Sequence, residues 1–326
     1  MRLGTLNSPF PVFLAPMAGV SDLPFRVLCK EMGCDLTYTE MISAKGLQYK
    51  NERTNELLKT APQERPCGVQ LFGSEPDIVA QMAAKIEQIS CGEILLIDLN
   101  MGCPAHKIVA NGEGSALMKT PLLAAKIIER TVNAVRLPVT VKFRKGWDDT
   151  LINALEFAKM AEQSGAAAIT LHGRTRAQGY SGNADWNCIG EVKAALKIPV
   201  IGNGDVYCAA DALRLRAHTD CDGVMVARGA QGNPFIFREI QSALKGRYCP
   251  PPTLNERIDM ALRHARAQLA YKGEHGLIEM RKHIAWYVRG LPKSAQLRTK
   301  INECRTLDEL ESLLMQFCDE LNKKVL

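Results

Sequence analysis

Short apolar runs alternate with amphipathic segments along most of this 326-residue chain, and no other feature constrains the fold as strongly. Several of the runs are continuously apolar, which is typical of strands that are buried on both faces. The pattern predicts eight strands, over residues 11–17, 36–41, 67–73, 93–100, 137–144, 166–174, 198–205 and 221–229.

The segments between these runs carry apolar residues at helical spacing. We expect helices over Glu75–Ser90, Thr120–Val135, Ala154–Ser164 and Ala209–Ala217. Strand–helix alternation repeated eight times fits a (β/α)8 barrel, which typically takes about 250 residues. An open doubly wound sheet is the rival, but it usually has fewer parallel strands and a switch point. The sequence therefore predicts an α/β fold, with a (β/α)8 TIM barrel over residues 1–245.

A second region follows a linker. The stretch at 244–256 holds three consecutive prolines, and the pattern after it is helical throughout. We therefore expect an all-helical C-terminal domain over residues 251–326. Its first part is basic, because Arg257 to Lys300 contains ten Lys or Arg residues and three Asp or Glu residues. These side chains form either a solvated helix surface or a surface that binds a phosphate backbone.

Composition restricts the class of protein. The net charge of +6 permits a polyanionic partner without requiring one. Eleven cysteines form no C-x-x-C pair and histidine occurs only six times, so we expect no metal site. No secretory signal precedes the first apolar run, and no apolar run approaches the roughly 20 residues of a membrane span. We therefore expect a cytoplasmic protein without membrane contact, and we expect it to be a monomer.

Polar residues recur where the predicted strands end. In (β/α)8 enzymes the active site lies at the C-terminal ends of the strands. Six of the eight runs end on such residues: Gln70, Asn100, Cys103, Lys142, Arg144, His172, Arg174, Asn203, Asp205 and Arg228. The last two runs lead into GNGD (202–205) and ARGAQGNP (227–234), whose small residues let backbone N–H groups approach a phosphate.

Two of these residues have more than one interpretation. Lys142 is either a Schiff-base nucleophile of an aldolase or a fixed cation that faces an electron-rich ring such as a flavin. Arg144 lies on the same face of the strand and would lower the pKa of Lys142 in both cases. Cys103 stands just past its strand, between a glycine and a proline. It is therefore either a structural thiol or a residue aimed at the site.

Seven short motifs are spread over residues 15–237. They are APMAGVSDLPFR (15–26), VQLFG (69–73), DLNMGCPAHKIV (98–109), VKFRKGW (141–147), LHGRTRAQGYSG (171–182), IGNGDV (201–206) and MVARGAQGNPFIF (225–237). Together they resemble the tRNA-dihydrouridine synthases, and the bacterial B-type branch in particular. The D-x-N-x-G-C-P stretch followed by H-G-R-T is the most specific part. The resemblance implies a flavin enzyme with a barrel and a C-terminal helical tRNA-binding domain.

The resemblance also implies a set of site residues. The FMN-binding positions would be Pro16, Met17, Ala18, Gln70, Lys142, His172, Asn203, Gly204, Asp205, Ala227 and Arg228. The target uracil would be held by Asn100, Arg144 and Tyr180. Family members often have Gly-Arg where this chain has Ala227-Arg228, and that change keeps a backbone N–H for the flavin phosphate.

The reaction that the resemblance implies gives Cys103 a role. Reduced FMN, recharged by NADPH or by NADH, would deliver hydride to C6 of a D-loop uridine in tRNA. Cys103 would give a proton to C5. A general acid must hold its proton at working pH, and a thiol with an ordinary pKa of about 8.5 does so. In this interpretation Arg257–Lys300 would bind the tRNA backbone.

Three alternatives stay open at this point. Another FMN barrel oxidoreductase, acting on a small pyrimidine or an enone, would share the flavin site but would not need the helical domain. A flavin-free aldolase would use Lys142 as its nucleophile. An RNA-binding or chaperone protein that has lost catalysis would not need Cys103 beside a complete flavin site.

Overall fold

Eight parallel strands form a barrel in the computed structural model, which describes residues 1–323. The strands are β3 (Val12–Leu14), β4 (Thr37–Tyr38), β6 (Cys67–Phe72), β7 (Ile94–Met101), β8 (Val139–Asp148), β10 (Ala168–Thr175), β11 (Val200–Asn203) and β12 (Gly223–Val226). They pair in the order β3-β12-β11-β10-β8-β7-β6-β4, and a parallel bridge between Phe13 and Leu36 closes the ring. Each strand overlaps its predicted run, so the predicted (β/α)8 barrel is confirmed.

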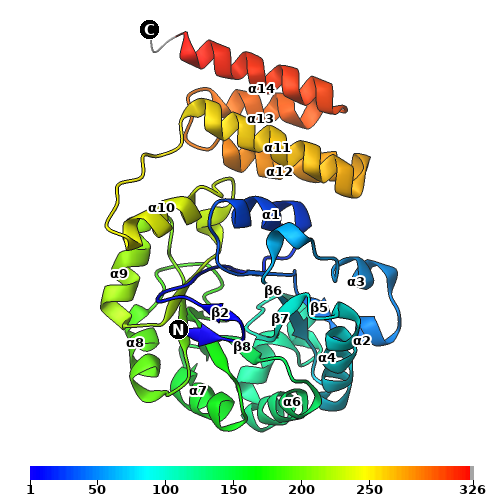
Figure 1. The fold of residues 1–326 in the computed structure, drawn as a ribbon, viewed down its shortest axis with the longest axis vertical. Coiled ribbons are helices and arrows are strands. Elements are labelled where there is room, and N and C mark those ends of the chain that lie inside the picture. Colours follow the sequence, from blue (N-terminus) through cyan, green and yellow to red (C-terminus); the bar gives the residue numbers. More distant parts are fainter. Residues whose placement is uncertain (324–326) are drawn as a thin grey trace.

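Helices surround the strands (Figure 1). They are α1 (Leu23–Glu31), α2 (Ala44–Gln48), α3 (Glu52–Glu56), α4 (Pro76–Ser90), α5 (His106–Ala110), α6 (Pro121–Ala134), α7 (Ala154–Gln163), α8 (Trp186–Ala195), α9 (Ala209–Thr219) and α10 (Ile236–Leu244). Shorter elements are the 3₁₀ turns η1 (Pro62–Glu64), η2 (Gly114–Lys119) and η3 (Arg228–Ala230) and the strands β5 (Ile42–Ser43) and β9 (Leu151–Ile152). The four predicted helices are α4, α6, α7 and α9, with ends within two residues of those expected. Proline begins α4 and α6, where its missing N–H costs no hydrogen bond.

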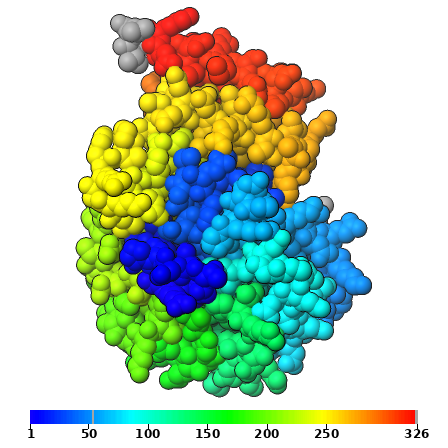
Figure 2. Space-filling view, in the orientation of Figure 1, coloured from blue at the N-terminus to red at the C-terminus, as the bar shows by residue number. Residues whose placement is uncertain are grey.

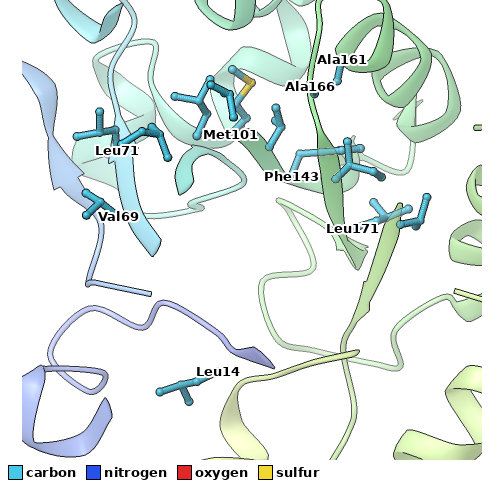
Figure 3. Packing of buried hydrophobic residues seen from close by; sticks show 14 of the residues in the cluster. Leu14, Val69, Leu71, Met101, Phe143, Ala161, Ala166 and Leu171 are labelled. Atoms are coloured by element: carbon cyan, nitrogen blue, oxygen red, sulfur yellow. The ribbon is translucent and has the colours of Figure 1, made fainter. Parts of the chain in front are cut away.

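Strand side chains alternate between two environments. Val69 and Phe143 point outward and join the large apolar core between strands and helices, together with Ala161 of α7 (Figure 3). Because successive side chains of a strand face opposite ways, Gln70 and Lys142 point into the barrel. This alternation puts the polar residues of the motifs on the inner face.

The N-terminal hairpin closes one end of the barrel. β1 (Arg2–Leu3) pairs antiparallel with β2 (Leu6–Asn7). Leu3 and Leu6 pack in a second apolar cluster with Leu95, near the start of β7. The hairpin therefore covers the end where the strands begin, opposite to the end where barrel enzymes place their sites.

Four further helices form a bundle after the linker (Figure 1). They are α11 (Leu254–Lys272), α12 (Glu274–Tyr287), α13 (Ser294–Glu303) and α14 (Leu307–Asn322). A Thr–Glu capping box begins both α11 and α14. The region predicted as a helical domain, 251–326, is helical as expected, and its residues 324–326 lie outside the described residues. The described part of the chain contains no helix whose length and hydrophobicity together would let it span a lipid bilayer.

The bundle packs directly on the barrel, as the space-filling view shows (Figure 2). Leu28 of α1 and Phe235 before α10 belong to the apolar core of the bundle. An ion pair crosses the same interface, since Lys272 Nζ of α11 lies 2.8 Å from the carboxylate of Asp22. The Asp22 side chain also caps the N-terminus of α1. The barrel and the bundle therefore share one buried interface.

Candidate active site

A cavity of about 540 Å³ lies at the C-terminal ends of the barrel strands, within the size range of cofactor pockets. Its lining includes fourteen of the fifteen predicted site residues: Pro16, Met17, Ala18, Asn100, Cys103, Lys142, Arg144, His172, Tyr180, Asn203, Gly204, Asp205, Ala227 and Arg228. Gln70 is fully buried and does not line the cavity. These residues are widely spaced in the sequence, and they meet here because the C-terminal ends of all eight strands lie at the same end of the barrel.

Two basic side chains, the half-buried Lys142 and the buried His172, face the cavity without partners among the described residues. Within the described residues, neither the Lys142 amine nor the His172 ring makes a hydrogen bond or an ion pair. Burial, with a smaller effect of nearby Arg144, lowers the pKa of Lys142 to about 8. Burial and the Lys142 charge hold the pKa of His172 well below its usual range, so this ring is neutral at pH 7. Both groups are available to an occupant of the cavity.

Asp205 organises one end of the cavity. Its carboxylate lies 2.8 Å from Arg174 Nη2 and 3.4 Å from Arg228 Nη2. It also accepts a hydrogen bond from the backbone N–H of Ala184. Gly204 has a φ of +126°, and a Cβ there would stand 2.6 Å from the Ala184 methyl group. The turn after β11 therefore needs glycine.

Arg174, which also pairs with Asp205, does not line the cavity. It is 2% exposed, and it donates to the carbonyl groups of Ser181 and Gly182 besides pairing with Asp205. These bonds fix the loop after β10. Arg228 is the guanidinium left at the cavity surface, between the rings of Tyr180 and Tyr207.

The loop after β7 presents Cys103 to the cavity. The thiol is half-buried, and the Cys103 carbonyl accepts bonds from the backbone N–H and the hydroxyl of Ser115. Burial raises the pKa of Cys103, while a bond from the backbone N–H of Ala105 and the charge of Arg144 partly offset that effect. The thiol therefore keeps its proton at neutral pH.

Asn100 and Arg144 are both engaged in the Cys103 loop. Asn100 Oδ1 accepts from the backbone N–H groups of Gly102 and Cys103, at 3.1 and 2.9 Å. Arg144 Nε donates to the Gly102 carbonyl at 2.8 Å. Arg144 Nη1 donates to the carbonyl groups of Thr175 and Gly179. The sequence pattern identified both residues but could not show that they hold this loop.

Sequence reasoning missed Asp98 and Tyr207. Asp98 is 1% exposed and lies below Asn100 on the inner face of β7, so the period-two alternation of the strand could have found it. Tyr207 lines the cavity mouth and is half exposed, as is Tyr180. Tyr207 follows the GNGD motif directly, but nothing in the sequence marks its orientation.

Most basic residues of the bundle bond to other residues of the chain, several of them in exposed ion pairs. Of the ten Lys and Arg residues from Arg257 to Lys300, seven have side chains that bond to described residues, namely Arg257, Arg263, Arg266, Lys272, Arg281, Lys282 and Lys293. The side chains of the other three, Arg289, Arg298 and Lys300, are exposed and make no such bond with the part of the chain that the structure describes. Lys282 bonds to the carbonyl of Gly19, in the loop that follows Ala18.

A family model described as dihydrouridine synthase (Dus) matches residues 13–323. The chain belongs to the dihydrouridine synthase family. The match includes the barrel, the linker and the helical bundle, so the family relationship extends over both structural parts.

Curated relatives agree with this assignment. A protein of Rickettsia conorii named "Probable tRNA-dihydrouridine synthase" is 46% identical over 307 residues, which is 93% of this chain and 91% of that protein. A similarly named protein of Mycobacterium tuberculosis is 40% identical over 329 residues, 96% of this chain and 84% of that protein. These dihydrouridine synthase relatives match both the barrel and the bundle.

A solved structure supports the fold. Histamine dehydrogenase from Rhizobium sp. 4-9 superimposes with a TM-score of 0.52 and 14% identity, over 82% of this chain. The chain spans 50% of the length of that protein. At 14% identity this likeness shows the fold alone.

Proposed function

We propose that this protein is a tRNA-dihydrouridine synthase that uses FMN and NADPH to reduce the C5–C6 bond of a D-loop uridine. One observation carries the proposal: Cys103 shares a cavity with Lys142 and His172, two basic groups without partners among the described residues. The family and the names of the relatives indicate the substrate. Such a substrate is consistent with a cytoplasmic location.

The cavity fits FMN by the chemistry of its donors. Lys142 and His172 are free to contact the ring, and Arg228 with the small residues Gly204 and Ala227 is placed for the phosphate. Pro16, Met17 and Ala18 supply an apolar wall. When bound and reduced by NADPH, FMN would supply hydride to C6 of the uracil.

Cys103 supplies the proton to C5. A general acid must be protonated before the reaction, and burial raises the pKa of this thiol. Asn100 and Arg144 hold the backbone of its loop from two sides, so the sulfur has a defined position. Tyr180 lies beside Arg144 and Arg228 at the cavity mouth, where it would contact the uracil.

The substrate must present its base outside the helical stack. The cavity admits a single flipped base more readily than a duplex, and tRNA loops offer bases that are already unstacked. Exposed tyrosines at the mouth suit stacking with neighbouring bases.

The proposed function is tested by incubating the full-length protein with FMN, NADPH and an unmodified tRNA transcript. We expect one or more D-loop uridines to gain two hydrogens, as detected by mass spectrometry of nuclease fragments. A transcript that stays unmodified, while a free pyrimidine or an enone is reduced, would favour the small-molecule alternative.

Removal of Arg228 should weaken the binding of FMN. Loss of a charge-assisted bond to the phosphate should raise the Kd of R228A for FMN about 10- to 100-fold. Flavin fluorescence titration of the apoprotein measures this. R130A, which removes an exposed arginine on α6, should leave the Kd unchanged. Equal affinities of R228A and the wild type would exclude the phosphate role.

Reversal of the three unpaired charges of the bundle should weaken tRNA binding. If Arg289, Arg298 and Lys300 contact phosphates, R289E/R298E/K300E should reduce the slope of log affinity against log salt by about 2 to 3. The control K85E/K126E/R130E makes the same charge change on α4 and α6 and should leave the slope unchanged. Unchanged tRNA affinity in the first variant would place the RNA elsewhere.

A further inference from the structure

A chain of buried hydrogen bonds leads from the barrel interior to the loop that carries Cys103. The Asp98 carboxylate accepts from Thr140 Oγ1 and from Gln70 Nε2, both at 2.6 Å. Gln70 Oε1 accepts from Asn100 Nδ2 at 2.8 Å. Asn100 Oδ1 in turn accepts from the backbone N–H of Cys103 at 2.9 Å. Asp98 and Gln70 are almost completely buried, at 1% and 0% exposure.

The direction of every donor in this chain follows from its two ends. An ionised carboxylate can only accept hydrogen bonds, so Gln70 turns its NH₂ group toward Asp98 and its oxygen toward Asn100. Asn100 then turns its NH₂ group toward Gln70 and its oxygen toward the backbone N–H groups of the loop. The carboxylate at one end therefore supports the amide orientation that the loop requires at the other.

We propose that Asp98 is a positioning residue for Cys103, which acts through Gln70 and Asn100 to fix the loop that carries the thiol. The inference rests on the proposed role of Cys103 as the proton donor. It assigns Gln70 a function as a link behind the cavity wall. A misplacement of a reacting group by about 1 Å can lower a rate about 100-fold, so a fixed loop matters for proton transfer.

The loop has few other supports that could replace this chain. Arg144 holds the carbonyl of Gly102, and Ser115 holds the carbonyl of Cys103. Both bonds reach carbonyl groups, whereas Asn100 Oδ1 accepts from the N–H groups of the same two residues. Loss of the Asn100 contact would leave two N–H groups of the loop without that acceptor.

The ionisation of Asp98 fits this role. Burial raises the pKa of Asp98 to about 6, while the bonds from Thr140 and Gln70 and the charge of Lys142 on β8 act in the opposite direction. The phenol of Tyr38 on β4 also feels the Asp98 charge, and burial keeps it protonated. The carboxyl group is thus ionised at pH 7.5, the acceptor-only state that the chain needs.

A charge swap tests the chain. Q70E places a second carboxylate against Asp98, and both readouts are taken at pH 8.5 so that the two carboxylates repel each other rather than share a proton. This repulsion should disturb the links to Asn100 and the loop. In D98N/Q70E, the amide introduced at position 98 can donate to the carboxylate introduced at position 70, and its oxygen can accept from Thr140. The carboxylate at position 70 can in turn accept from Asn100. The double variant therefore restores every hydrogen bond of the chain with the same total charge. D98N alone should be mild, because its oxygen can still accept from Gln70.

Two readouts follow the position of the thiol. The first is the rate at which iodoacetamide alkylates Cys103 in the flavin-free, full-length protein, resolved by peptide mass spectrometry with Cys91 as the internal control. The second is kcat for tRNA reduction at saturating tRNA, with KM and flavin content measured in parallel. A loosened loop exposes the thiol to water, so Q70E should alkylate Cys103 at least about threefold faster and lower kcat about 10-fold or more.

We expect D98N/Q70E to return both the alkylation rate and kcat to within about twofold of the D98N values. Unchanged Cys103 alkylation in Q70E, or a double variant no better than Q70E, would overturn it. The alkylation readout does not require the reaction to be known. Restored alkylation in a protein that reduces no tRNA would support the positioning role while contradicting the proposed function.

Discussion

Replacement of Cys103 by alanine should lower the rate of tRNA reduction about 10²- to 10⁴-fold, the usual contribution of a positioned general acid. The thiol lies in the cavity with Lys142 and His172, and burial keeps it protonated. Alanine cannot supply the proton. A water molecule that takes the place of the thiol would be less well positioned to donate one. Single-turnover reduction of tRNA by the prereduced enzyme measures the effect.

The same variant should keep two other properties. C103A should bind FMN with unchanged affinity and should be reduced by NADPH at the wild-type rate, because neither property uses the thiol proton. C91A is the matched control, since Cys91 is an exposed thiol at the end of α4 and lies outside the cavity. Wild-type tRNA reduction by C103A would show that another group donates the proton.

Acid should destabilise the protein through two histidines at the interface of barrel and bundle. His264 and His283 are 0% and 1% exposed, and both pack against Phe25 of α1. Burial lowers the pKa of His264 to about 4, with Asp22 opposing the shift and Lys272 adding to it. Burial, His264 and Lys282 lower the pKa of His283 to about 3, against smaller effects of Asp22 and Glu279. Both rings are therefore neutral in the folded protein.

The sign of the pH dependence follows from these values. In the unfolded chain each histidine has a pKa of about 6.5, so the unfolded state takes up protons first as the pH falls. The stabilising contribution is complete above pH 6.5 and is lost as the pH falls toward the pKa of the folded state. Between pH 7.5 and pH 4.5, each histidine should therefore lower the free energy of unfolding by about 2 to 3 kcal/mol.

H283L should reduce this acid sensitivity. Neither ring nitrogen of His283 has a hydrogen-bond partner among the described residues, so an apolar side chain loses no bond there. Between pH 7.5 and pH 4.5, H283L should lose about 2 to 3 kcal/mol less unfolding free energy than the wild type in urea titrations. H275A, which removes an exposed histidine of α12, should follow the wild-type curve. Equal losses in H283L and the wild type would contradict the prediction.

The sequence predicts the architecture well because the two faces of a barrel strand differ in composition. Residues that face the helices are apolar, and residues that face the cavity are polar. Phe143 and Leu171 face the helices, whereas their neighbours Lys142 and His172 face the cavity. An apolar run with isolated polar residues near its end therefore reports both the strand and the site. Because side chains alternate between the two faces of a strand, the polar strand-end residues could be predicted from the sequence alone.

Other features depend on contacts between distant segments and could not be predicted. Gln70 points inward as expected, but its amide is committed to Asp98 and Asn100. The basic residues of the bundle look alike in sequence, yet Arg266 pairs with Glu311 of α14, whereas Arg298, which is likewise exposed, has no partner among the described residues. Which cations find a partner depends on how the helices pack, and residue type does not show it.

The most direct test of the central claim is the visible spectrum of the FMN-loaded protein under anaerobic conditions. We expect NADPH to bleach the flavin absorption and unmodified tRNA to restore it, with dihydrouridine formed in matching amount. Recovery with a free small molecule but not with tRNA would contradict the proposed substrate. A full-length protein that takes up no added FMN would contradict the flavin site itself.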